Sequence, residues 1–284
     1  MKDDPPSGTE TSPEEVHGND GRPLLEVRGL SKVYENGFRA VDDVTYSIGP
    51  GLLVGLIGPN GCGKTTMMRC INMMHRTTSG DILIDGESVL DKTPAQIARV
   101  VSNVPAELKA SFGLTVFDTV MLGRYPYLQN VWWETEEDET LVEETLKKFG
   151  IHHLKDRPLN MLSSGERQRV LIAKAYVQEP RLMLVDEPTS HLDMKYKLEV
   201  MEYLQYMVKK DMSILVAEHD ISLMARYCDL CIIMKKGKIV AIGDPKEVIT
   251  SGLIEEVYEV NASVGFDNDG ELYVLPKRYR SKRE

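Results

Sequence analysis

Three short stretches of the sequence combine residue types that could bind and cleave a polyphosphate. The first, residues 58–66, reads GPNGCGKTT and fits the pattern Gly-x4-Gly-Lys-Thr. Glycines let the backbone turn its N–H groups toward phosphate oxygens, and a helix that begins there adds the positive end of its dipole. In this pattern Lys64 would reach the β- and γ-phosphates, and the Thr65 hydroxyl would ligate Mg²⁺. The stretch predicts a P-loop, whose contact residues would be Gly58, Pro59, Asn60, Gly61, Cys62, Gly63, Lys64, Thr65 and Thr66.

An acidic pair follows an apolar run farther along the chain. Residues 182–187 read LMLVDE, so Asp186 and Glu187 come directly after a buried strand pattern. Asp186 would hold the metal, directly or through its water shell. Glu187 could orient a water for in-line attack and accept its proton. The alternative is a pair of helix-capping carboxylates, but the buried strand before them favours the catalytic interpretation.

A histidine closes another apolar strand pattern, SILVAEH at 213–219. The imidazole of His219 could form hydrogen bonds with the γ-phosphate and with the attacking water. A lone histidine is more often structural than functional. At the carboxyl edge of a parallel sheet, however, ligands collect, and this position favours a functional role for His219.

A fourth stretch, LSSGERQR at 162–169, is a second anion site. A helix that opens with Ser163, Ser164 and Gly165 offers a hydroxyl, free N–H groups and a positive dipole end. One nucleotide has a single γ-phosphate, and the residues named above already surround it. The second site would therefore serve the nucleotide of another copy, in a head-to-tail dimer with two-fold symmetry.

The elements around these stretches alternate between strand and helix patterns. The run LLVGLIG at 52–58 is apolar, ends in glycine and precedes a helix pattern, which is typical of a buried parallel strand. The alternation predicts an α/β core with a mostly parallel sheet. Further strands are expected at 24–30, 43–48, 81–86, 181–187, 213–219 and 231–243, the last as a hairpin that turns at Lys236 and Gly237.

The middle of the chain, from Thr115 to Gln178, shows helix patterns and no strand pattern. It predicts an all-helical insertion at about 106–160 within the α/β core. Thr115 and Asp118 would cap one helix over 115–125, and Gly150 would end another.

The first of these helices has an apolar face, and the acidic run 134–139 precedes the body of the second. The acidic run is interpreted as a solvated face. The apolar face, with Leu114 and Phe112 ahead of it, either packs in the core of the insertion or lines a groove for a short helix of a partner.

The order of these motifs, with LVDEPTSHLD at 184–193 and AEHD at 217–220, resembles the ATP-binding cassette (ABC) ATPases over roughly residues 24–255. The resemblance implies a P-loop core with an antiparallel β portion and an inserted helical subdomain, and ATP and Mg²⁺ as ligands. Residues 162–166 would be the signature motif, and Tyr34 would stack on adenine. The motif residues would be Leu162, Ser163, Ser164, Gly165 and Glu166, and the loop from Ser190 to Asp193 would link the two sites of the dimer.

The chain departs from the family pattern at three positions. Ser164 replaces the usual Gly, and Glu166 replaces the usual Gln. After Pro105, where relatives have a Gln near the metal, the chain has Ala106 and then Glu107. Either Glu107 takes the place of that Gln at the metal, or a water does; Mg²⁺ tolerates a water, and the charge of Glu107 favours the first.

Within the family, the chain is similar to subunits that drive the import of iron–siderophore complexes, haem or cobalamin. This similarity implies integral membrane permease subunits as partners, an external substrate-binding protein, and a peripheral position on the cytoplasmic face of the cell membrane. An importer or exporter of another cargo is one alternative. A soluble ABC ATPase is another, but the chain has one P-loop and no heptad run.

Composition agrees with these expectations. The net charge of −10 argues against nucleic acid as a partner. Residues 1–23 lack periodicity and predict a disordered acidic extension without the apolar core of a signal peptide. Residues 256–284 would form a C-terminal extension that ends in a basic tail. Cys228 and Cys231 have no second ligand pair near them, so they are expected to be apolar packing residues.

Overall fold

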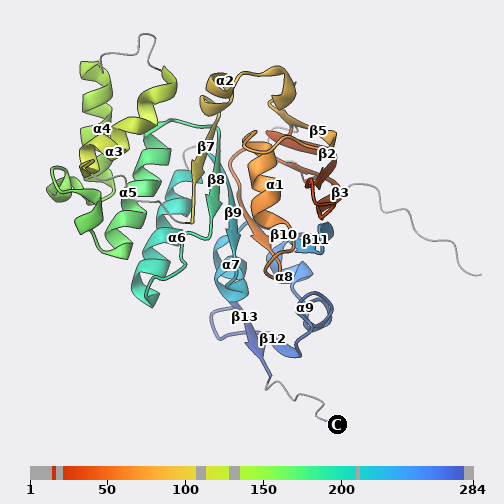
Figure 1. Cartoon of the computed structure of the whole chain (residues 1–284). Coiled ribbons are helices and arrows are strands. Elements are labelled where there is room, and N and C mark those ends of the chain that lie inside the picture. The colour runs from red at the N-terminus through yellow and green to blue at the C-terminus, as the bar shows by residue number, and fades with distance from the viewer. Residues whose placement is uncertain (1–14, 17–21, 107–112, 128–134, 209–211, 278–284) are drawn as a thin grey trace, which may run out of the picture.

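The computed structural model describes residues 15–16, 22–106, 113–127, 135–208 and 212–277 (Figure 1). At its centre lies a six-stranded sheet in the order β11-β10-β4-β9-β8-β7. All neighbouring pairs are parallel except β10 with β11, which form the expected hairpin. The predicted α/β fold with a mostly parallel sheet is confirmed. Its strands are β4 (Leu53–Ile57), β7 (Val101–Val104), β8 (Leu182–Asp186), β9 (Ser213–Glu218), β10 (Leu230–Lys235) and β11 (Lys238–Gly243).

The central strands are apolar throughout because both faces of the sheet are covered. Along β8, Leu182 and Leu184 point into one buried cluster, whereas Met183 and Val185 point into the other. Side chains alternate between the two faces of a strand, so this run must be apolar at every position. If the strand alternated between apolar and polar residues, one of the two cores would lose its packing residues from β8.

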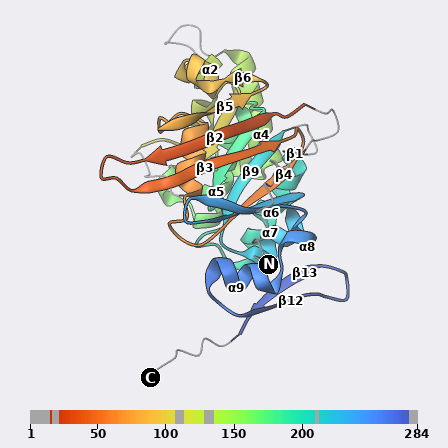
Figure 2. The ribbon, with the colours of Figure 1, turned by 90° about the vertical axis from the view of Figure 1, so that its right-hand side faces the viewer.

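A second sheet, in the order β1-β3-β2-β5-β6, is antiparallel except for the parallel pair of β1 and β3, and it forms a second layer, seen face-on in Figure 2. Helix α1 (Lys64–Ile71) lies between the two sheets, where Met67, Met68 and Ile71 are buried. The second sheet thus packs against one side of α1, the helix that follows the P-loop. Its strands are β1 (Glu15–Val16), β2 (Leu25–Val33), β3 (Arg39–Ile48), β5 (Ser79–Ile84) and β6 (Glu87–Ser88). Within the N-terminal segment expected to be disordered, Glu15 and Val16 thus pair with β3, and most of the segment lies outside the described residues.

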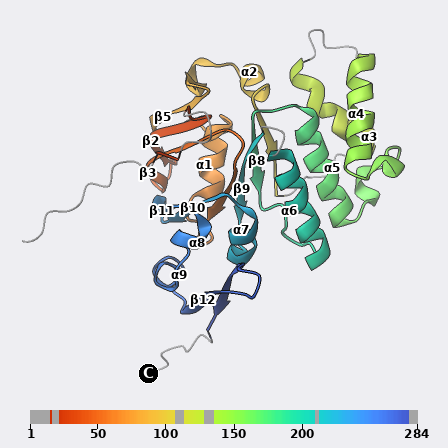
Figure 3. The same ribbon diagram turned by 180° about the vertical axis from the view of Figure 1, so that it is seen from behind.

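Helices cover the opposite face of the central sheet (Figure 3). They are α3 (Val116–Met121), α4 (Glu136–Lys148), α5 (Ser164–Val177), α6 (Met194–Val208) and α7 (Ile221–Tyr227). Short helical turns join them, namely η2 (Leu122–Tyr127), η3 (His152–Leu154) and η4 (Leu159–Met161), while η1 (Val89–Asp91) and α2 (Pro94–Ala98) precede β7. The capping box of Thr115 with Asp118 is confirmed, and so is the end of α4 at Gly150, whose φ is 65°.

Two helix predictions are wrong in part. The helix expected over 115–125 ends as an α-helix at Met121 and continues as a 3₁₀ turn that contains Pro126, a residue that cannot donate to a preceding turn. Asp138, expected on a solvated face, is only 7% exposed. Arg124 Nε donates to its carboxylate at 2.8 Å, and this buried ion pair joins η2 to α4.

The chain ends in α8 (Pro245–Val248), α9 (Ser251–Tyr258) and a hairpin of β12 (Ala262–Phe266) and β13 (Leu272–Pro276). The hairpin packs on α7, where Val274 N donates to Ser222 Oγ at 3.0 Å. The ATPase domain was expected to end at about residue 255, and this position lies inside helix α9. Among the described helices, none combines the length and the apolar character needed to cross a lipid bilayer.

Candidate functional site

The P-loop connects β4 to α1 at the carboxyl edge of the central sheet. Gly58, Gly61 and Gly63 have φ values of 157°, 76° and 112°, a region that side chains disfavour. A Cβ on Gly63 would lie 2.3 Å from the carbonyl oxygen of Ala40, and one on Gly58 would lie 2.3 Å from that of Met234. Both close approaches explain why the pattern requires glycine at these positions.

The lysine of the loop is held inside it. Lys64 is 6% exposed, and its Nζ donates to the carbonyl oxygen of Gly58 at 2.6 Å. The Nζ atom also lies 3.5 Å from the carbonyl oxygen of Pro59, and because an ammonium has three donors, the two contacts to the loop leave one for a phosphate oxygen. Cys62 is buried beneath the same turn, and burial raises the pKa of its thiol, which therefore stays protonated and inert at neutral pH.

The predicted metal ligands lie side by side. Thr65 Oγ1 donates to Asp186 Oδ1 at 3.2 Å, which joins the start of α1 to the end of β8. Burial raises the pKa of Asp186, opposed in part by this hydrogen bond. A buried carboxylate without a full counter-charge next to a hydroxyl is a donor set that suits Mg²⁺, which prefers oxygen ligands.

Glu187, which follows β8, and His219, which follows β9, are in direct contact. His219 Nε2 lies 2.6 Å from Glu187 Oε1, and about a third of each side chain is exposed. Glu187 has φ 47°, and its backbone N–H donates to the carbonyl oxygen of Ala217 at 2.9 Å. The turn after β8 thus anchors to β9 and aims the carboxylate at the imidazole. The sequence placed these residues at one sheet edge but did not predict their mutual hydrogen bond.

A further acid, Glu218, was missed by the sequence analysis. It is 4% exposed, and its Oε1 accepts from Thr189 N at 2.9 Å and from Thr189 Oγ1 at 2.6 Å. Its Oε2 accepts from His219 N at 2.9 Å. One buried carboxylate therefore fixes both the loop after Glu187 and the backbone of His219. The only signal in the sequence was an acid at the end of an otherwise apolar strand.

Tyr34 lies beside the P-loop helix, just past the end of β2. Its hydroxyl is 3.1 Å from Thr66 Oγ1, and its ring meets the His75 ring edge-on with centroids 5.8 Å apart. The side chain is half-buried. The position at the mouth of the loop suits a base-stacking residue, which remains the expectation for Tyr34.

The predicted second anion site is the N-terminus of α5, which lies apart from the P-loop. In Figure 1 the strands β7 and β8 separate α5 from α1. Ser163 caps the helix: its Oγ lies 2.8 Å from Glu166 Oε2, and its backbone N–H also donates to that carboxylate at 2.8 Å. Ser163 and Ser164 are exposed. These residues make no hydrogen bond with the P-loop group among the described residues, so within one copy they serve no part of that site.

The remaining signature residues pack inward. Leu162 is 5% exposed, and Arg167 Nη2 donates to its carbonyl oxygen at 3.2 Å. A Cβ on Gly165 would lie 2.9 Å from the Tyr196 ring of α6, so this glycine lets α5 approach α6 closely. That contact couples the signature helix to the helix that follows Asp193.

The loop from Ser190 to Asp193 is held by local hydrogen bonds. Ser190 Oγ donates to the carbonyl oxygen of Glu187 at 2.9 Å, and Asp193 Oδ1 accepts from Tyr196 N at 3.1 Å at the start of α6. The loop therefore connects Glu187 at one end to the packed helices α6 and α5 at the other.

Other candidate residues give mixed outcomes. Glu107 and Phe112 lie outside the described residues, so the position of the missing Gln stays a prediction. Of the two alternatives for the apolar face of α3, the structure supports the core: Val116, Val120 and Met121 are buried in the core cluster and do not line a groove. Cys228 and Cys231 are buried, free thiols where α7 ends and β10 begins, which confirms the packing interpretation.

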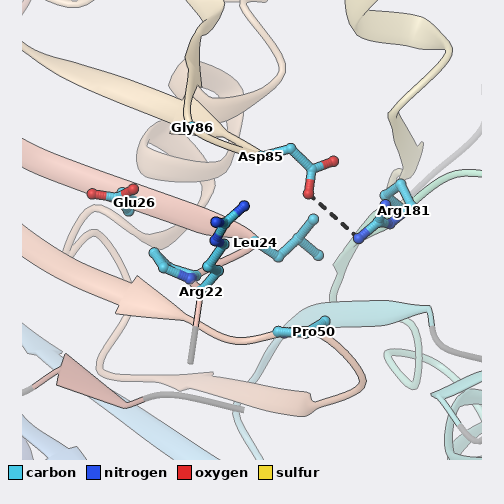
Figure 4. Close-up of a pocket in the computed structure, with 8 residues that line it drawn as sticks. Arg22, Leu24, Glu26, Pro50, Asp85, Gly86 and Arg181 are labelled. Carbon is cyan, nitrogen blue, oxygen red and sulfur yellow. Dashed lines mark ion pairs between the residues drawn. The ribbon is translucent and has the colours of Figure 1, made fainter. Parts of the chain in front are cut away.

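A hollow of about 490 Å³ lies at the opposite edge of the sheet (Figure 4). Its walls include Arg22, Glu26 and Pro50, and Arg181 Nη2 is 3.3 Å from Asp85 Oδ1 across it. Arg181 precedes β8, whereas Asp186 ends it, so this hollow lies at the amino ends of the strands and takes no part in the P-loop site.

Comparison with known proteins agrees with this geometry. A family model described as ABC transporter matches residues 41–190. The cobalamin import ATP-binding protein of Halobacterium salinarum is 35% identical over 86% of this chain, which spans only 61% of that relative. The iron(3+)-hydroxamate import ATP-binding protein of Bacillus subtilis is 33% identical over 80% of this chain and 85% of its own length.

One solved structure adds a dimer to the comparison. It is a dimeric, post-hydrolysis state of an ATP-binding cassette bound to ADP and phosphate, with 26% identity and a TM-score of 0.70 over 78% of this chain and 99% of its own. Because the family model spans more than half of the chain and the Bacillus relative is matched over most of its length, the chain belongs to the ABC transporter family, as one of its ATP-binding proteins.

Proposed function

We propose that this chain is the ATP-hydrolysing subunit of an ABC importer for an iron–siderophore complex, haem or cobalamin. The observation that carries the proposal is the contact between His219 and Glu187 at 2.6 Å, placed at the strand ends beside the P-loop. The names of the cobalamin and hydroxamate relatives support the class of cargo. A permease would bind the cargo, and an external binding protein would deliver it.

In the proposed reaction, water attacks the γ-phosphorus of ATP while the bond to the β–γ bridging oxygen breaks. Glu187 orients the water and accepts its proton, which then passes to the phosphate product. His219 holds the Glu187 carboxylate through Nε2, and with both ring nitrogens protonated its Nδ1–H would donate to the γ-phosphate. Lys64 and the P-loop N–H groups bind the phosphate oxygens in both ground and transition states.

A divalent cation fits the pair of Thr65 and Asp186. Bound Mg²⁺ would supply a positive charge that neutralises the phosphate oxygens. Asp186 and the Thr65 hydroxyl would hold it, and the burial of Asp186 would make the carboxylate favour a cation over water. Glu107 as an additional ligand stays a prediction.

The complete site is proposed to need two copies. The exposed Ser163 and Ser164 at the N-terminus of α5 have no phosphate-binding partner in their own copy, and a solved relative is a dimer. We propose head-to-tail packing, in which α5 of one copy closes over the ATP on the P-loop of the other. The loop from Ser190 to Asp193 would then pass near both sites. The dimer would work at the cytoplasmic face of the membrane, attached through permease subunits.

The variant Glu187→Gln tests the proposal. Loss of the proton acceptor should lower ATP turnover by about 10²–10⁴-fold, while ATP binding remains. The variant should accumulate as an ATP-bound dimer of twice the 32.0 kDa chain mass in light scattering after gel filtration. Glu202→Gln, on the exposed face of α6, is the control. Turnover near that of wild type in Glu187→Gln would refute the role of Glu187.

A further inference from the structure

Three buried sulfur atoms meet where α7 ends and β10 begins. Met224 and Cys228 are one helical turn apart, and the Cys228 N–H donates to the carbonyl oxygen of Met224 at 2.9 Å. Cys231 follows in β10, so the sequence pattern is Met-x3-Cys-x2-Cys. Met224 and Cys231 are 0% exposed, and Cys228 is 8% exposed. We call these three side chains the sulfur cluster.

Gly55 of β4 marks the point around which the sulfur cluster gathers. A Cβ on this glycine would lie 3.0 Å from Cys228 Sγ, 3.3 Å from Cys231 Sγ and 3.4 Å from Met224 Sδ. Gly55 is also the register partner of Cys231 in the parallel pair of β4 and β10. Packing accounts for the burial of each side chain by itself. Their convergence on one point needs the three chain segments together, and a larger residue at position 55 would fill the shared space.

The spacing of the sulfur atoms suits a metal ion with three sulfur ligands. Cys228 Sγ lies 3.7 Å from Met224 Sδ. Metal–sulfur bonds of about 2.3 Å in a planar, threefold arrangement place the ligand atoms about 4.0 Å apart. The two sulfur atoms of α7 would therefore need to separate by only about 0.3 Å to share such an ion.

The ligand types select the metal. Thiolate and thioether ligands favour Cu(I), whereas Zn²⁺ takes Cys, His or carboxylate ligands, in structural sites four of them. In the described part of the chain, no three His, Cys, Asp or Glu side chains come together as a metal site. The carboxylate nearest in sequence is that of Asp229, and its Oδ2 accepts from Leu53 N at 2.8 Å. The sulfur cluster therefore fits a soft ion with three ligands.

In the free chain the Cys228 thiol stays protonated at neutral pH. Burial raises its pKa well above the usual value, and a hydrogen bond with the Cys231 thiol adds to that rise. A metal ion can still bind, because it replaces the thiol protons. The turn between α7 and β10 gives access to the cluster, since Asp229 is exposed there beside the slightly exposed Cys228.

We propose that Met224, Cys228 and Cys231 bind one Cu(I) ion. On binding, two S–H bonds break and two copper–thiolate bonds form, while the Met224 thioether donates a lone pair as the third ligand. Two protons leave to water, and the oxidation state of copper does not change. The site needs neither ATP nor a second copy of the chain. The bound ion would join α7 to β10 beside β4, the strand that leads into the P-loop.

Anaerobic competition with the Cu(I) chelator bicinchoninate tests the site in the full-length chain. Wild type should withdraw one Cu(I) per chain from the chelator, whereas Cys228→Ala and Cys231→Ala should withdraw none. Met224→Leu conserves side-chain volume and should lower the affinity at least about tenfold, because loss of even an outer-shell partner costs about 10–100-fold. Cys70→Ala removes a buried thiol outside the sulfur cluster and, as the matched control, should bind Cu(I) like wild type.

X-ray absorption at the copper edge identifies the ligands. Wild type should show three sulfur atoms at about 2.3 Å from copper, and Met224→Leu should show two. Met224→Leu is the mildest change and decides the matter if an alanine variant fails to fold. Failure of wild type to withdraw Cu(I), equal uptake by wild type and Cys231→Ala, or a nitrogen or oxygen ligand on copper would overturn the site.

Discussion

Glu218 is expected to hold together the strand edge that carries Glu187 and His219, although its own side chain forms no hydrogen bond with the P-loop among the described residues. It accepts three hydrogen bonds while 4% exposed, two from Thr189 and one from the backbone of His219. In Glu218→Gln, the single amide oxygen can still serve Thr189. The amide NH₂ must then face the His219 N–H, so two donors oppose each other and one charge-assisted hydrogen bond is lost.

The expected loss of stability follows from the one lost hydrogen bond between the His219 N–H and Glu218. A hydrogen bond to a charged group contributes about 1.5–3 kcal/mol, and the variant recovers some desolvation free energy of the buried charge. We therefore expect the free energy of unfolding to fall by about 2 kcal/mol, which corresponds to a fall in Tm of about 3 °C for a chain of 284 residues. Turnover should fall about tenfold because His219 and the Glu187 loop lose their common anchor.

Calorimetry and steady-state ATPase assays measure both effects. Glu202→Gln removes an exposed carboxylate from α6 and should change neither quantity. Thr189→Val should destabilise wild type more than it destabilises a Glu218→Ala background, since its partner is already absent there. Wild-type Tm and turnover in Glu218→Gln, or additive effects of Thr189→Val and Glu218→Ala, would refute the reasoning.

Two further predictions concern the ion pair of the helices and the P-loop backbone. Arg124→Met leaves the buried Asp138 without its counter-charge, which should lower the free energy of unfolding by about 3–5 kcal/mol at pH 7 in urea titrations. Although burial opposes it, hydrogen bonds from Arg124 and Thr135 hold the pKa of Asp138 below its usual 3.8, so the pair stabilises the fold above that pH. The difference in the free energy of unfolding between wild type and Arg124→Met should therefore become smaller as pH falls, because Asp138 becomes protonated in the variant. A difference that does not change with pH would contradict this assignment. Gly63→Ala forces a Cβ to 2.3 Å from the carbonyl oxygen of Ala40 at φ 112°, so calorimetric ATP binding should be lost, whereas the exposed Gly252→Ala on α9 should bind ATP normally.

Local patterns predicted most of the catalytic edge. The P-loop spacing, the acids after β8 and the histidine after β9 each depend on the end of a buried strand, and parallel strands bring such ends together. The capping box at Thr115 is equally local, because it involves residues three apart. These features could be read from the sequence because their partners are near in the chain or are fixed by the topology of the sheet.

Features that depend on distant partners were not predictable. Asp138 belongs to an acidic run that reads as solvated, and only the approach of Arg124 from η2 explains its burial. Glu218 has the same difficulty, since its partner Thr189 follows a different strand. The apolar face of α3 fits a core and a groove equally well, and only the position of α5 shows that Val116 and Val120 are buried.

The shared site is the central claim, and complementation between two inactive variants tests it most directly. Lys64→Ala damages the P-loop, whereas Ser163→Arg places a bulky cation at the exposed start of α5. A mixed dimer would keep one intact site, made from Lys64 of one copy and Ser163 of the other. An equimolar mixture should then recover about a quarter of wild-type ATPase activity, because half of randomly formed two-fold dimers are mixed and each has one working site. Activity no greater than the sum of the two separate variants would contradict the head-to-tail account.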